Sequence, residues 1–350
     1  MKQKLKWQLG LVILIVLIMV APGASAQEHG TIVFQAVSGG PIYAVQADGS
    51  NLRYLTTGLD PALSPDGQWV AFTRWENPQN GALGHLAIIN IDSGEERIIM
   101  NDVLQPKAPT WSPDGTHITI SMQHGGWIAP REDICGWGKP PREAYDIEST
   151  TVKGKGTYYC YTLPADPYWG LRVVEVATGV FEDLPRDDHS LSPAWDPANP
   201  WRLVYDADLG LMNLDMNQKT TWPLTADVGD HSPAFSPDGS KIAVSYYQHD
   251  HWEIYVMNAD GSGRVRLTST PWRVIGDQRL RGEEPRQWNN AAPVWSPDGS
   301  QLAFLTDRRG LWEIWVMHAD GSNPRPLFDS LPAEVNLQYF GADEQVLSWR

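Results

Sequence analysis

Short apolar runs recur along most of the chain, and turn-forming residues separate them. Gln301–Thr306 and Glu313–His318 are two such runs, rich in β-branched, aromatic and aliphatic side chains. Pro-Asp-Gly at 297–299 and Asp-Gly at 320–321 flank them, and glycine supplies the positive φ that a tight hairpin turn needs. The pattern predicts antiparallel strands joined by hairpins.

The same unit occurs twice in the chain. Residues 236–262 and 296–322 match at both ends and around a central Trp-Glu-Ile, while their middles differ. A further apolar run precedes each copy, at 232–235 and 292–295, so each unit contains four strands. Four strands are the content of one β-propeller blade. The matched ends are typical of a scaffold, and the divergent middle is where loops can be specialised.

Weaker copies extend the pattern over the whole chain. They begin near Pro61, Pro109 and Pro193; a unit at 31–50 lacks its first strand, and residues 335–340 read as a first strand with no unit after it. Joining these two halves would close a ring and hide both sheet edges. We therefore predict an all-β fold: a six-bladed β-propeller of four-stranded antiparallel blades, with the ring closed by the N- and C-terminal strands. Residues 345–350 also read as a strand, which has no place in this scheme.

The repeat, Pro-x-Trp-Ser-Pro-Asp-Gly followed by an apolar strand and Glu-Ile-Tyr-Val-Met-x-Ala-Asp-Gly-Ser, resembles the TolB-type, WD40-like (PD40) β-propeller repeat. The resemblance runs from about Thr31 to Phe328 and implies the propeller fold. In the periplasmic TolB family such a propeller serves protein–protein interaction, and similar propellers gate serine peptidases. Two differences limit the comparison: residues 27–30 leave no room for the α/β domain of TolB, and the chain has no GxSxG nucleophile elbow.

Residues 1–26 have the pattern of a secretory signal peptide. Three lysines precede an apolar run, and small residues end at Ala26. We expect residues 27–350 to form a single propeller domain, secreted or periplasmic, with no stable membrane anchor after signal cleavage. The net charge of −15 argues against nucleic acid as a partner, because phosphate binding needs basic surfaces.

Two long insertions, about 123–168 and 269–290, are expected on one face of the ring, because strand order groups the loops after second strands with the links between blades. Segments of this length are usually functional or disordered, and their aromatic content favours a packed cap over the ring. The candidate ligand-binding aromatics are Trp127, Trp137, Trp169, Trp272 and Trp288. The same residues could instead form the core of the cap.

The chain has two cysteines, Cys135 and Cys160, both in the first insertion. In an exported protein they favour one disulfide that closes a long loop. Two free thiols are the alternative.

Histidines and carboxylates also collect on the predicted loop face. His231, His249 and His251 are candidate ligand-binding residues, and His124, His189, Asp187, Asp188, Asp230 and Asp250 lie beside them in the pattern. Converging on a metal, they could form a metal-assisted lyase or hydrolase, although no HExxH motif is present. We favour a non-catalytic propeller, without metal or cofactor, that binds a protein, peptide or glycan through the looped face.

Overall fold

The computed structural model describes residues 30–76, 83–127, 129–185, 187–329, 332, 335–341 and 344–350. The predicted signal peptide, residues 1–26, lies outside these ranges. Within them, no helix is long and apolar enough to cross a membrane.

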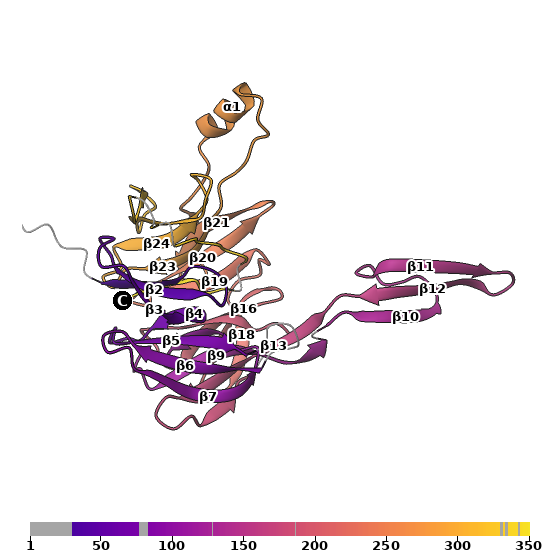
Figure 1. Cartoon of the computed structure of the whole chain (residues 1–350), viewed down its shortest axis with the longest axis horizontal. Helices are drawn as coiled ribbons and strands as arrows, with labels where there is room; N and C mark the ends of the chain where they lie inside the picture. Colours follow the sequence, from indigo (N-terminus) through magenta and orange to yellow (C-terminus); the bar gives the residue numbers. More distant parts are fainter. Residues whose placement is uncertain are drawn as a thin grey trace, which may run out of the picture.

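The strands of the described residues form six four-stranded antiparallel sheets and one three-stranded sheet (Figure 1). In spatial order, sheet 1 is β27 (Leu347–Trp349), β1 (Thr31–Gln35), β2 (Pro41–Gln46), β3 (Arg53–Thr57), and sheet 2 is β4 (Leu59–Leu63), β5 (Trp69–Trp75), β6 (Leu83–Asn90), β7 (Glu96–Leu104). Sheet 3 is β8 (Lys107–Trp111), β9 (His117–Trp127), β13 (Asp166–Glu175), β14 (Phe181–Asp183), and sheet 4 is β15 (Leu191–Trp195), β16 (Arg202–Ala207), β17 (Gly210–Asp215), β18 (Thr220–Pro223).

The remaining elements complete the chain. Sheet 5 is β19 (Asp230–Phe235), β20 (Lys241–Gln248), β21 (His251–Asn258), β22 (Val265–Arg266), and sheet 6 is β23 (Asn290–Trp295), β24 (Gln301–Thr306), β25 (Glu313–His318), β26 (Arg325–Pro326). The three-stranded sheet, which we call the arm, is β10 (Arg131–Trp137), β12 (Gly156–Leu163), β11 (Tyr145–Val152), and the helix α1 (Trp272–Leu280) lies between sheets 5 and 6. The predicted all-β fold of four-stranded antiparallel sheets is confirmed.

The repeated Ser-Pro-Asp-Gly turns share one hydrogen-bond pattern. In sheet 5, Ser236 Oγ donates to Asp238 Oδ1 over 2.6 Å, and the Lys241 N–H donates to the same hydroxyl over 2.9 Å. Ser112 with Asp114 and Ser296 with Asp298 repeat these contacts. Side chains that satisfy local backbone donors stabilise tight turns, which gives the motif a structural reason to recur.

The apolar core is divided among the sheets. Among the described residues, six clusters of buried side chains each join two neighbouring sheets. Two tryptophans reinforce these contacts from the first strand of a sheet: Trp111 Nε1 donates to Ala62 O, and Trp295 Nε1 donates to Ala234 O, each over 3.0 Å. Both indoles are buried, so they pack the sheets together.

The first strands are bent in the same way in sheets 2 to 6. The residue before proline has a positive φ in each, at Asp60, Ala108, Ser192, Ser232 and Ala292, and the ladder to the second strand shifts there. Such bulges redirect backbone groups away from their own ladder. Ala108 N–H accordingly donates to Asp60 Oδ2 of the preceding sheet over 2.8 Å.

The C-terminal strand differs from the prediction. Residues 335–340 form no strand; Val335, Leu337 and Tyr339 are buried against the core between sheets 6 and 1. The strand that pairs with β1 is β27, at the residues that had no place in the sequence pattern. The alternation of apolar residues at 335–340 therefore arises from side-chain packing against the core. The backbone hydrogen bonds to β1 are made by residues 347–349 instead.

Both insertions contain regular structure instead of a cap. The first forms the arm, which extends far from the sheets, and the second forms α1, which stands off at another side (Figure 1). Trp137 is 54% exposed and Trp272 is 83% exposed. The predicted cap is wrong, because the arm extends away from the four-stranded sheets and Trp137 packs against Tyr158 of its own neighbouring strand.

Candidate functional site

Both insertions leave their sheets at equivalent ends. The arm follows the second strand of sheet 3, where Trp127 at the end of β9 pairs with Asp166 at the start of β13. The segment with α1 leads into the first strand of sheet 6, where Asn290 pairs with Thr306 at the end of the second strand. Each insertion is therefore at the end of the sheet where the repeat sequence diverges.

The arm is held together by few contacts. Cys135 and Cys160 lie opposite each other on β10 and β12 and form a disulfide, as predicted. Trp137 packs edge-on against Tyr158 with ring centroids 5.0 Å apart. Every residue of β11 is exposed, and no residue of β10 is buried. Neither face of the arm is covered by another described element, which leaves aromatic and aliphatic groups accessible.

The base of the arm is tied to sheet 4 by a histidine. His189 Nδ1 lies 2.7 Å from Asp208 Oδ1, and its Nε2 lies 3.7 Å from Asp166 Oδ1 at the start of β13. Tyr168 packs edge-on against the same ring at 6.4 Å. These contacts orient the root of the arm relative to the sheets.

The five candidate tryptophans fall into different environments. Trp127, Trp137 and Trp272 are at least half exposed. Trp169 is buried, with Lys107 Nζ 5.4 Å from its ring centre, and Trp288 is partly buried beneath Arg308. Trp169 was predicted to contact a ligand, and its indole is only 8% exposed, so little of its ring is accessible.

The candidate histidines do not share one site. His231 Nδ1 lies 2.7 Å from Asp206 Oδ2, and its ring packs edge-on against Trp252. His251 is buried between Asp250 and Glu253, and its hydrogen bond lowers the pKa of the Asp250 carboxyl. His249 is exposed at the tip of the β20–β21 hairpin. The described residues contain no group of three or more His, Cys, Asp or Glu side chains that could hold a metal ion.

A hollow beside His249 was missed by the sequence reasoning. It has a volume of about 370 Å³ and is lined by Tyr246, Tyr255, Arg264 and Asp227 among others. The Arg264 guanidinium lies 4.5 Å and 4.6 Å from the two tyrosine rings and pairs with buried Asp230. Burial raises the pKa of Asp230 despite this partner. The sequence did contain one signal for this hollow: residues 246–251 differ from the corresponding residues of the other copy of the repeat, 296–322.

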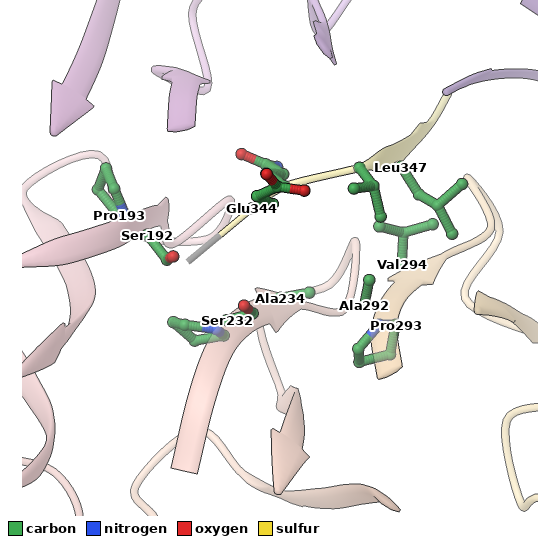
Figure 2. Close-up of a pocket in the computed structure, with 12 residues that line it drawn as sticks. Ser192, Pro193, Ser232, Ala234, Ala292, Pro293, Val294, Glu344 and Leu347 are labelled. Carbon is green, nitrogen blue, oxygen red and sulfur yellow. The ribbon is translucent and has the colours of Figure 1, made fainter. Parts of the chain in front are cut away.

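Two hollows that share Pro193, Ala234 and Val294 lie among the inner strands, and the larger has a volume of about 100 Å³. Figure 2 shows the lining of the smaller hollow by Ser192 and Pro193 of β15, Ser232 of β19 and the Ala292–Val294 stretch of β23, with Glu344 and Leu347 above them. Its volume is about 30 Å³, enough for one or two water molecules. The exposed insertions are a candidate for recognition that needs no cavity.

Known proteins place this architecture among the TolB propellers. No family model matches the chain. An uncharacterized protein, Atu1656, from Agrobacterium fabrum is 23% identical over 75% of this chain and 72% of its own length. The Tol-Pal system protein TolB of Anaeromyxobacter dehalogenans is 35% identical over 105 residues, which are 30% of this chain and 20% of that protein.

Two solved structures of TolB proteins have a similar fold. TolB from Acinetobacter baumannii superposes with a TM-score of 0.59 at 15% identity, covering 91% of this chain and 66% of that one. A putative TolB from Agrobacterium tumefaciens gives a TM-score of 0.55 at 16% identity, covering 92% and 97%. In its repeat sequence and in its fold, this chain is similar to the TolB-type, WD40-like β-propeller repeat proteins.

Proposed function

We propose that the protein is an exported, non-catalytic propeller that binds a partner protein through its arm. The observation that carries the proposal is a disulfide-linked three-stranded sheet with neither face covered by the described chain. An uncovered sheet with exposed aromatic side chains has the features of an interaction surface. The six sheets would form a closed six-bladed ring that presents the arm and α1 on one face.

Export is supported by three independent features. The disulfide suits an oxidising compartment, the sequence of residues 1–26 has the pattern of a signal peptide, and matched relatives are Tol-Pal system proteins TolB. We infer a secreted or periplasmic location, and we propose that no membrane anchor remains after signal cleavage.

Recognition would use the exposed aromatic side chain of Trp137 on the arm, together with Trp127 at the end of β9 where the arm begins. Trp127, which stacks beneath Arg131 at 4.4 Å, and Trp137 combine apolar area with few rotatable bonds, so their burial costs little conformational entropy. The Cys135–Cys160 disulfide limits the motion of the arm before binding, and such preorganisation favours affinity. Trp272 on α1 would supply a second contact.

Removing the arm tests the proposal. Because Trp127 pairs directly with Asp166, an Asn-Gly turn can replace the residues between them and leave the sheet 3 hairpin intact. The purified variant and the wild type would each be cross-linked in an envelope extract of the native host, and captured proteins would be quantified. We expect the specific capture of a partner to fall at least about tenfold, as when a hot spot is removed.

The matched control shortens the other insertion. A variant with a Gly-Ser linker in place of residues 272–286 removes α1 and should keep most of the capture. Thermal unfolding must show that both variants keep the fold. Equal capture by the arm-deleted protein and the wild type would refute the proposed role of the arm.

A further inference from the structure

The arm has two outer edges, β10 and β11, because β12 lies between them. No described strand pairs with the outer side of β11, and all eight of its residues are exposed. A free edge presents unpaired backbone N–H and C=O groups, and these can pair with another strand.

The disulfide shows which backbone groups of β11 point outward. The Cα atoms of Cys135 and Cys160 are 4.1 Å apart, which matches a non-hydrogen-bonded antiparallel pair. The backbone of Cys160 therefore faces β11 and bonds its partner there, Glu148. Since the direction alternates along a strand, Thr150 and Val152 also bond inward, and the N–H and C=O groups of Ser149 and Thr151 point outward.

The two edges differ in how well they are protected. The ladder of β10 is broken between Arg131 and Ile134, with a positive φ at Asp133. On β11 the irregularity ends before Glu148, and the register is continuous from Glu148 to Val152. This stretch contains no proline or lysine, the usual devices that block pairing at an edge. The regular part of β11 is thus an accessible template.

We propose that the outer edge of β11 binds an extended segment of a partner protein by antiparallel strand addition. This inference rests on the proposed role of the arm and names its mode of recognition. Main-chain hydrogen bonds to Ser149 and Thr151 supply affinity, and alternate side chains supply specificity. The added strand lies closest to Glu148, Thr150 and Val152, since these face it in non-hydrogen-bonded pairs.

Charge and shape define the chemistry of the added segment. A basic residue opposite Glu148 neutralises an exposed carboxylate, a β-branched residue suits Thr150, and an aliphatic residue suits Val152, which is 38% exposed. Because the strands are antiparallel, the segment carries these residues in the order aliphatic, β-branched, basic at every second position.

A second copy of the chain fits this edge poorly. In an antiparallel pair, side chains that lie directly opposite each other are on the same face of the sheet. If a two-fold axis relates two β11 strands, one residue must therefore pair with its own copy at the axis. Centring on Ser149 places Glu148 opposite Thr150, centring on Thr150 places it opposite Val152, and centring on Glu148 opposes two carboxylates. None of these registers gives Glu148 a basic neighbour, so a different protein is the better occupant.

A designed peptide provides the probe. Fluorescence anisotropy would follow the labelled peptide Ser-Val-Ser-Thr-Ser-Lys-Ser and a control with Glu in place of Lys, titrated with the full-length disulfide-bonded protein. We expect the wild type to prefer the Lys peptide about three- to fivefold, the range of a cross-strand charge pair. The variant Glu148→Lys should reverse this preference.

A backbone variant tests the strand pairing itself. Thr151→Pro removes one outward N–H without breaking a backbone bond to β12. It also removes the contact of the Thr151 hydroxyl with the Thr157 hydroxyl over 3.2 Å, and the matched control Thr151→Val removes the same contact. We expect the proline variant to lose peptide binding while the valine variant keeps it, with circular dichroism and an intact disulfide showing that the arm is folded.

Several results would overturn the inference. These are absence of peptide binding at millimolar protein, binding that Thr151→Pro leaves unchanged, or no reversal in Glu148→Lys. A wild-type dimer in sedimentation that Thr151→Pro dissociates would assign the edge to a second copy. If deletion of the arm abolishes partner capture but Thr151→Pro does not, the proposed role of the arm is supported and strand addition at β11 is refuted.

Discussion

The buried carboxylate of Asp230 reduces the free energy of unfolding at neutral pH. Its side chain is inaccessible to solvent, and Arg264 approaches its carboxylate to 2.6 Å. Burial raises the pKa of Asp230, and the guanidinium only partly opposes this. The charged form is therefore less favourable in the fold than in the unfolded chain.

Substitution of Asp230 should reveal this cost as a pH dependence. Because the folded pKa lies above the ordinary value of 3.8, the stability that this group contributes is fully present below that value and is lost as the pH rises through the folded pKa. The stability of the wild type relative to Asp230→Asn should accordingly decrease from pH 4 upward. Urea unfolding across this range measures the difference.

Asp238 provides the control with the opposite sign. Hydrogen bonds from Ser236 and Ser240 lower its pKa to about 2, so its contribution is present above 3.8 and is lost as the pH falls toward 2. The stability of the wild type relative to Asp238→Asn should fall on acidification. An Asp230→Asn difference that increased with pH would contradict the role assigned to burial.

The arm is an element whose order depends on one covalent link. Its residues belong to none of the six buried clusters of the described chain, and a small sheet without a covered face is marginally stable in water. A disulfide that closes a loop of this length stabilises by about 3 kcal/mol. The six four-stranded sheets contain no cysteine, so they do not share this dependence.

Removing the disulfide should therefore loosen the arm alone. In the double variant Cys135→Ser/Cys160→Ser, we expect amide hydrogens of β10, β11 and β12 to exchange much faster, while those of sheets 1 to 6 keep their protection. Hydrogen exchange with mass spectrometry measures both regions in one experiment. Equal loss of protection in sheet 5 would show that the arm and the ring unfold together.

At the scale of the whole molecule, distant parts of the chain complete one sheet. Trp349 of β27 pairs with Ile32 of β1 and is buried in the cluster between sheets 6 and 1. Ser348 Oγ accepts a hydrogen bond from Leu63 N–H of sheet 2 over 3.0 Å. The last residues of the described chain thus connect three sheets.

Truncating this tryptophan should destabilise the entire fold. We expect Trp349→Ala to lower the free energy of unfolding by about 3–5 kcal/mol, the usual cost of removing a buried indole. Trp272→Ala is the control, since its side chain is 83% exposed and its loss should be nearly neutral. Chemical denaturation of the two variants checks the prediction, and similar stabilities would contradict the role of β27.

Much of the scaffold could be predicted because its signals are local. The Ser-Pro-Asp-Gly turns owe their geometry to hydrogen bonds within a few residues, as at Ser236 and Asp238, so the motif marks each hairpin wherever it occurs. Trp111 and Trp295 occupy the same position of the repeat, and both are buried. The Cys135–Cys160 disulfide followed from there being two cysteines in a chain that the sequence predicts to be exported.

The errors share a different physical origin. Residues 335–340 have the alternation of a strand, yet their apolar side chains pack against neighbouring sheets without a ladder. The aromatic insertion was expected to cover the other sheets, yet its strands pair with one another and its aromatic side chains pack within the arm. Both outcomes depend on which segments, far apart in sequence, come into contact in the fold. The local amino-acid composition does not determine those contacts.

By itself, the sequence determined the repeating unit, its turns, the all-β class and the position of the two insertions, because each depends on residues close together in the chain. Only the tertiary structure decided that β27 completes sheet 1, that the aromatic insertion projects as an arm instead of forming a cap, and that the histidines stay in separate pairs. The physical reason is that these features arise from contacts between segments far apart in sequence, where burial and backbone pairing compete.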